Sequence, residues 1–92
     1  MLRYGDDLMK DYSKITRYIS SKNVTVICTY RHNFDASRNC GSFVVYDGKN
    51  ITDESFELFM EYLECGLNET DLEKKLEKFI EEIEEGKIDV TF

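Results

Sequence analysis

The spacing of apolar residues changes from helical to strand-like along the first half of the chain. In residues 6–21 the apolar positions lie three or four residues apart, at Leu8, Tyr12, Ile15 and Ile19. This spacing predicts an amphipathic helix, with Asn23 in the left-handed conformation at its end. Residues 24–31 and 42–46 are rich in β-branched and aromatic residues, which predicts two strands that pair antiparallel.

Two more helices are predicted in the second half, and they repeat one plan at an offset of twenty residues. One runs from an N-cap at Thr52 to a glycine stop at Gly66, and the other runs from Thr70 to Gly86. Cap residues of these types are typical of helix ends. The two apolar stripes are Phe56, Phe59, Met60 and Leu63, then Leu76, Phe79, Ile80 and Ile83. Residues 88–92 alternate apolar and polar positions, which predicts a last strand.

The predicted order of elements is therefore α-β-β-α-α-β. Elements of this mixed kind favour an α+β fold, a two-layer domain in which helices pack on one face of a small antiparallel sheet. The chain has 92 residues, of which 41% are apolar. This length and composition suit a single domain over residues 1–92 with one hydrophobic core.

Charge is divided unevenly between the two halves. Residues 1–50 carry 8 Lys and Arg against 5 Asp, a net charge of +3, whereas residues 51–92 carry 4 Lys against 14 Asp and Glu, a net charge of −10. The twenty-residue repeat arranges these acids as two ridges, one on each predicted helix. The first ridge is Asp53, Glu57, Glu61 and Glu64, and the second is Glu73, Glu77, Glu81 and Glu84.

The two predicted helices differ at one pair of positions. Where the later helix has Lys78 and Glu82, the earlier one has Leu58 and Tyr62, an apolar pair away from its main stripe. One interpretation is that another part of the fold covers this pair. The other is that Leu58 and Tyr62 are an exposed anchor beside acids, a composition typical of partner interfaces.

The inventory of catalytic and metal-binding residues is small. His32 is the only histidine, so a nucleophilic pair would need Cys28 or Cys40 beside it. His32, Asp35 and Cys40 share a loop, but their spacing matches no metal motif. We therefore predict no enzyme, no catalytic residues, no metal site and no cofactor. A small enzyme or metal protein built on His32 and Cys40 is kept as a rival hypothesis.

The N-terminal sequence lacks the hydrophobic region of a signal peptide, and no apolar run is long enough to span a membrane. The three cysteines, Cys28, Cys40 and Cys65, are odd in number and unevenly spaced, which favours reduced thiols. These features predict a cytoplasmic protein.

Acidic side chains fixed on rigid elements can imitate a phosphate backbone toward a basic, nucleic-acid-binding surface. We therefore expect a small acidic binding protein that inhibits or sequesters a basic protein partner, such as a nuclease, without binding nucleic acid or a membrane itself. In size, acidity and mixed layout the chain resembles small phage-encoded anti-CRISPR inhibitors and bacterial nuclease-immunity proteins. The alternative is a homodimeric interaction module whose acidic helices serve only solubility.

Overall fold

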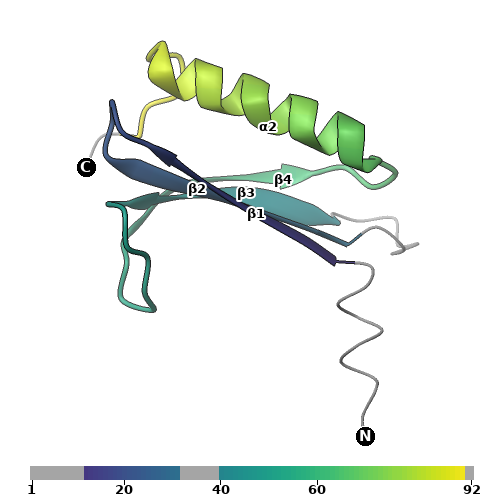
Figure 1. Ribbon diagram of the computed structural model, residues 1–92, viewed down its shortest axis with the longest axis horizontal. Coiled ribbons are helices and arrows are strands. Elements are labelled where there is room, and N and C mark those ends of the chain that lie inside the picture. The colour runs from purple at the N-terminus through teal and green to yellow at the C-terminus, as the bar shows by residue number, and fades with distance from the viewer. Residues whose placement is uncertain (1–11, 32–39, 91–92) are drawn as a thin grey trace, which may run out of the picture.

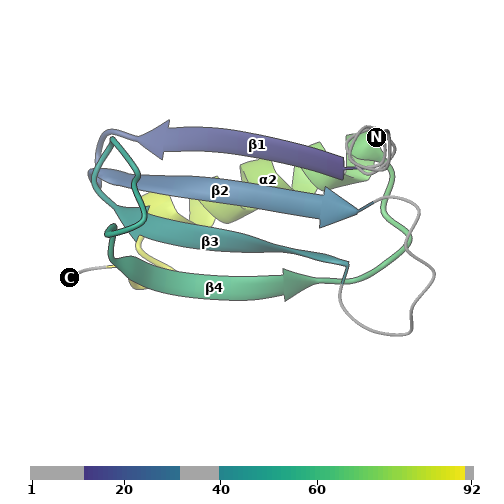
Figure 2. The same ribbon diagram turned by 90° about the horizontal axis from the view of Figure 1, so that it is seen from below.

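The computed structural model describes residues 12–31 and 40–90, which form a four-stranded antiparallel sheet and a helix (Figure 1). The strands are β1 (Tyr12–Ile19), β2 (Val24–Arg31), β3 (Gly41–Asp47) and β4 (Glu57–Leu63), and the helix α2 (Glu69–Glu84) follows them. The strands lie in chain order, so β1 and β4 are the two edges of the described sheet (Figure 2). Helix α2 crosses one face of the sheet (Figure 1).

The predicted order α-β-β-α-α-β is wrong. The described residues follow the order β-β-β-β-α, with one helix at the C-terminal end instead of several. The predicted strands at 24–31 and 42–46 are confirmed as β2 and β3, and they pair antiparallel with Cys28 opposite Phe43.

Strand β1 occupies much of the segment that we expected to be the first helix; residues 6–11 of that segment lie outside the described residues. Ile15 and Ile19 are four residues apart, a spacing that suits one face of a helix and one face of a strand equally well. Five of the eight residues of β1 are β-branched or aromatic, and such residues favour a pleated strand. Ile15 pairs with Cys28 and Ile19 with Val24. The left-handed Asn23 is confirmed, with φ 54°, but it lies in the turn between β1 and β2.

Strand β4 replaces the helix predicted between Thr52 and Gly66. The segment Glu57–Leu63 contains five apolar residues out of seven, more than one helical stripe needs. Leu58 and Tyr62, which did not fit the helical stripe, are compatible with a strand whose two faces both carry apolar residues. A register shift at Val45 and Tyr46 marks an irregularity near the start of β4.

The core lies between α2 and the centre of the sheet. On the helix-covered face of β2 the buried side chains are Val24, Val26, Cys28 and Tyr30, and Thr25 is also buried. The helix contributes four buried residues, Leu72, Leu76, Phe79 and Ile83. Phe79 packs on the Phe43 and Phe59 rings, with centroid distances of 4.7 and 5.9 Å. Burial of each large apolar side chain contributes about 1.5–3 kcal/mol, so these contacts fix α2 on the sheet.

The ends of α2 are set by a polar cap and a glycine. Asn68, not the predicted Thr70, is the N-cap, and its side chain accepts a hydrogen bond of 2.8 Å from the Asp71 N–H. Gly86 follows the helix with φ 82°, as the sequence predicts for the stop.

The predicted last strand is not found: residues 88–90 lie outside any strand of the described chain, although Val90 is buried in the core.

A disulfide joins Cys40 to Cys65, with the two Cα atoms 5.1 Å apart. The expectation of three reduced thiols is therefore wrong, and only Cys28 is free. The two cysteines are 25 positions apart along the chain, and this spacing gives no sequence signal for their pairing. Pairing becomes possible only because β3 begins beside the end of β4.

Candidate partner-binding surface on strand β4

The two acidic ridges predicted from the repeat do not form a pair of matching helical rows. Glu57, Leu58, Glu61 and Tyr62 lie on β4, Glu64 directly follows it, and Asp53 lies in the β3–β4 connection. Only the second ridge, Glu73, Glu77, Glu81 and Glu84, is helical. The structure therefore separates the predicted site residues into two groups on different elements.

The first group lies on β4, which forms one edge of the described sheet (Figure 2). The Leu63 carbonyl accepts a hydrogen bond of 3.2 Å from the Cys40 N–H, so the backbone of Leu63 faces β3. Backbone groups of successive residues in an antiparallel strand point to alternate sides. The N–H and C=O groups of Met60 and Tyr62 therefore point outward, where no strand of the described chain pairs with them.

The side chains of β4 divide between the two faces of the sheet. Glu61 pairs with Phe43, which is buried under α2, so Glu61 and Leu63 belong to the helix-covered face. Met60 pairs with Val44, and Tyr62 pairs with Ser42, on the opposite face. Met60 is 39% exposed and Tyr62 is 62% exposed. An aromatic ring and a thioether thus lie open beside the acidic positions of the same strand.

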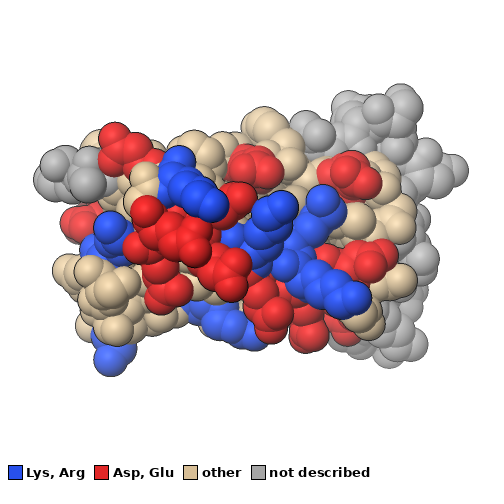
Figure 3. Space-filling model, turned by 90° about the horizontal axis from the view of Figure 1, so that it is seen from above, with Lys and Arg blue, Asp and Glu red and all other residues tan. Residues whose placement is uncertain are grey.

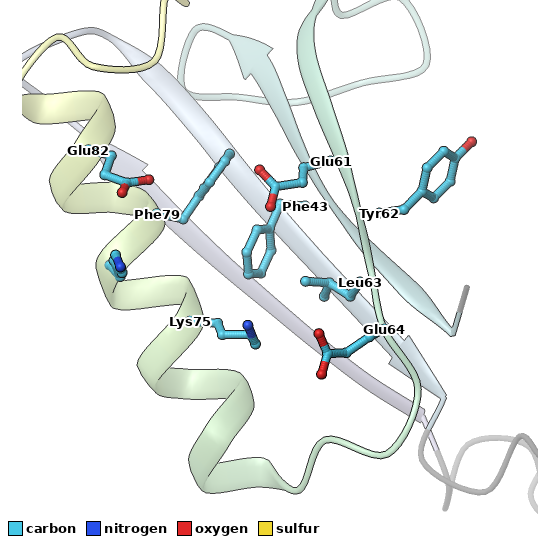
Figure 4. A pocket seen from close by; sticks show the side chains of 9 residues that line it. Phe43, Glu61, Tyr62, Leu63, Glu64, Lys75, Phe79 and Glu82 are labelled. Carbon is cyan, nitrogen blue, oxygen red and sulfur yellow. The ribbon is translucent and has the colours of Figure 1, made fainter. Parts of the chain in front are cut away.

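A groove of about 290 Å³ separates β4 from α2 (Figure 4). Its floor is apolar, formed by Phe43, Leu63 and Phe79. The charged residues of its rims are Glu61 and Glu64 on the strand side, and Lys75, Lys78 and Glu82 on the helix side. No ion pair joins the two rims among the described residues; Lys87 and Glu85, beyond the end of α2, form a salt bridge of 3.2 Å. The rim nearest β4 is therefore acidic and available.

The acids of the second ridge lie away from this groove, whose helix-side acid is Glu82. Ser13 of β1 donates a hydrogen bond of 3.3 Å to the Glu69 carboxylate, which shows that this flank of α2 faces β1. At about 100° per residue, Glu73, Glu77 and Glu84 are on the same flank as Glu69, and Glu81 points outward. On the outer face of α2, acidic and basic side chains are mixed (Figure 3). The second ridge does not join the first in one acidic surface.

Asp53 also lies apart from Glu61. It lines a groove of about 570 Å³ on the face of the sheet opposite α2, together with Lys14, Lys49 and Tyr46. Lys49 is also 5.3 Å from the centre of the Tyr18 ring. The cations beside Asp53 make this groove mixed in charge, so Asp53 does not belong to the acidic edge.

Several residues of the groove and edge were not predicted from the sequence. The packing of α2 beside a strand brings three helical residues to the groove, Lys75, Lys78 and Glu82. Met60 is part of the apolar stripe of the predicted helix, which would bury it. The signal available in the sequence is the density of apolar residues from Leu58 to Leu63, which exceeds one helical stripe and suits a strand on which Met60 and Tyr62 share a face.

The rival chemistry based on His32 and Cys40 loses one of its groups. Cys40 is held in the disulfide with Cys65, so it offers no thiolate to a nucleophilic pair or a metal; His32 and Asp35 lie outside the described residues. Burial raises the pKa of the Cys28 thiol to about 11, which keeps it protonated and unreactive near neutral pH. Within residues 12–31 and 40–90, no group of three His, Cys, Asp or Glu side chains is arranged to hold a metal.

The described part of the chain has no helix of the length and apolar character that a membrane span requires. Comparison with protein-family models, with curated proteins and with solved structures gave no match. The function is therefore argued from the geometry of β4 and its neighbours.

Proposed function

We propose that the protein is a small acidic binding protein that holds a basic protein partner on the β4 surface, which consists of Glu57, Met60, Glu61, Tyr62 and Glu64. The observation that carries the proposal is the open edge of β4, where exposed Tyr62 and Met60 lie in a segment that has no basic residue between Lys49 and Lys74. Exposed aromatic residues are frequent anchors of protein interfaces. The carboxylates beside them select for a basic surface.

Such a partner fits the class of nucleic-acid-binding proteins, because proteins that neutralise phosphates do so with lysine and arginine. Binding would block or sequester that basic surface. The total charge of −7 would also accelerate the encounter at low ionic strength. The cytoplasmic location remains a prediction, and the Cys40–Cys65 disulfide weighs against it because disulfides persist in oxidising compartments.

Charge reversal at the β4 surface tests the proposal. The double variant Glu57→Lys, Glu61→Lys should lose basic partners captured from a lysate at 50 mM salt, with a fall of about tenfold or more, equivalent to about 1.4 kcal/mol. The matched control is Glu81→Lys, Glu84→Lys, which makes the same charge change on α2. Quantitative mass spectrometry of the eluates compares the two. Equal losses in both variants would show that net charge alone, and not the β4 surface, determines binding.

A homodimer is the second candidate, since an open edge strand with exposed apolar residues can pair with a copy of itself. If two β4 strands pair antiparallel about a two-fold axis at Glu61, the two Glu61 side chains lie directly opposite each other. If the axis lies at Met60 or Tyr62, the two Glu61 side chains are diagonal neighbours on the same face. Like charges at these positions are destabilising. We therefore favour the heterologous partner, and sedimentation equilibrium over a range of concentrations distinguishes the two.

A further inference from the structure

The outward backbone groups of β4 indicate how a partner would bind. Met60 and Tyr62 each direct an N–H and a C=O away from β3, as the Cys40–Leu63 hydrogen bond and the alternation of the strand require. The edge is seven residues long and lies at the outside of the sheet (Figure 2). Proteins commonly protect such edges with charged side chains, bulges, proline or a covering element. Strand β4 carries Glu57 and Glu61 and has a register irregularity near its start, but it contains neither lysine nor proline.

We propose that the partner contributes an extended basic segment, which pairs with β4 as a fifth strand of the sheet. This inference rests on the proposed function and specifies its binding mode. Main-chain hydrogen bonds to Met60 and Tyr62 give the segment its register, and alternate side chains of the segment give specificity. One set of its side chains lies over the helix-covered face and the other lies beside Met60 and Tyr62.

The helix-covered side suits long basic side chains. A strand beside β4 brings alternate side chains to Glu61 and to the mouth of the groove, whose strand-side rim is Glu61 and Glu64. The groove volume of 290 Å³ is that of roughly ten waters in the liquid, which leaves room for one side chain. The charge of a lysine or arginine at the mouth of the groove would reach the Glu61 and Glu64 carboxylates, while its methylene groups lie along the groove. Lys75 and Lys78 are on the far rim and repel a cation that goes deeper.

The opposite side suits apolar residues. Met60 and Tyr62 are neighbours on that face and are separated by one residue of the strand. A β-branched or aromatic residue of the added strand would pack on them, since cross-strand pairs of this kind stabilise a sheet. The preferred segment therefore alternates basic and apolar residues.

Two synthetic peptides test the inference. One is an acetylated and amidated octapeptide of alternating lysine and valine, and the other has the same composition with all lysines before all valines. Titration into the full-length ¹⁵N-labelled protein, with amide hydrogen exchange measured at saturation, reports where each peptide binds. We expect the alternating peptide to slow exchange at Met60 and Tyr62 by at least tenfold, and the block peptide to leave these amides unprotected. Unchanged exchange at both amides, or no binding of the alternating peptide, would overturn the proposal.

A proline at the edge separates strand pairing from charge attraction. Met60→Pro removes an outward N–H without removing a hydrogen bond to β3, a position where edge strands tolerate proline. We expect Met60→Pro to bind the alternating peptide at least tenfold more weakly than Met60→Ala, which keeps the N–H. Equal affinity of the two variants would refute strand addition, whereas loss of salt-dependent binding in Glu57→Lys, Glu61→Lys would still support the acidic site. If Met60→Pro fails to fold by circular dichroism, the exchange experiment on the unsubstituted protein decides.

Discussion

Cys28 is the free cysteine of the chain, and its side chain is completely buried on β2. Its neighbours in the sheet are Ile15 and Phe43, so the thiol acts as a small apolar group. Burial disfavours the thiolate and raises the pKa of Cys28 from 9.0 to about 11. The proton on this sulfur is therefore part of the stability of the core.

The stability of the protein should fall in alkali partly because of Cys28. Its pKa is higher in the folded than in the unfolded state, so this contribution is complete below pH 9 and is lost as the pH rises toward 11. Urea unfolding between pH 8 and pH 11 measures the effect. Tyrosines and lysines titrate in the same range, so the control is Cys28→Ala. A Cys28→Ala variant whose stability falls with pH as steeply as that of the unsubstituted protein would contradict this assignment.

At the scale of elements, Tyr30 ties β2 to the connection between β4 and α2. Its ring is buried, and its hydroxyl donates a hydrogen bond of 2.6 Å to the Glu64 carbonyl and accepts one of 2.9 Å from the Leu67 N–H. Both partners lie between the acidic edge and the start of the helix. One hydroxyl thus fixes where β4 ends and how the chain enters α2.

Removing that hydroxyl should destabilise the protein without changing the fold. Tyr30→Phe leaves the Leu67 N–H and the Glu64 carbonyl without their partner in a half-buried site, which costs about 1–3 kcal/mol. Urea denaturation monitored by circular dichroism gives the free energy of unfolding. Tyr46→Phe is the control, because the Tyr46 side chain is only half-buried at the face opposite α2, and we expect a change within about 0.5 kcal/mol. Equal effects of both variants would exclude a special role for Tyr30.

The sequence predicts an element correctly where its apolar residues fit only one periodicity, that of a strand or that of a helix. Strand β2 has β-branched residues on both faces, and α2 combines the predicted stripe from Leu76 to Ile83 with a glycine stop at Gly86. The sequence predicts a helix at β1 because the four-residue spacing of Ile15 and Ile19 fits one face of a helix as well as one face of a strand. Tertiary pairing with β2 resolves that ambiguity, and such pairing is not visible in a local pattern.

The candidate site was predicted in part and for a mistaken reason. The helical interpretation places Glu57 and Glu61 on an acidic ridge and Tyr62 in an apolar pair beside it, whereas on the strand Glu61 and Tyr62 point to opposite faces of the sheet. The repeat that linked them to the acids of α2 has no structural counterpart. Lys75 and Glu82 line the same groove as Glu61 only because α2 packs on the sheet. Sequence spacing does not encode this long-range packing.

At the scale of the whole molecule, the two edges of the sheet and the outer face of α2 differ in charge. The acidic groups of the β4 surface lie at one edge of the sheet, and the flank of α2 that carries Glu73 and Glu77 lies toward the other edge. Between them, the outer face of α2 is mixed in sign (Figure 3). A partner that docks by charge complementarity therefore meets different surfaces at the two edges, and the apolar Tyr62 and Met60 distinguish the β4 edge from the other.

The Cys40–Cys65 disulfide fastens the end of β4, because Cys65 follows Glu64 and Cys40 precedes β3. Closing a loop of this length stabilises a folded chain by about 3 kcal/mol. Reduction should therefore lower the melting temperature by about 12–24 °C, since 1 kcal/mol corresponds to about 4–8 °C in a domain of this size. Differential scanning calorimetry with and without a reductant measures the shift. The double variant Cys40→Ser, Cys65→Ser should melt at one low temperature in both conditions, because Cys28 is already a free thiol. An unsubstituted protein that melts at the same temperature with and without reductant would show that the disulfide does not contribute to stability.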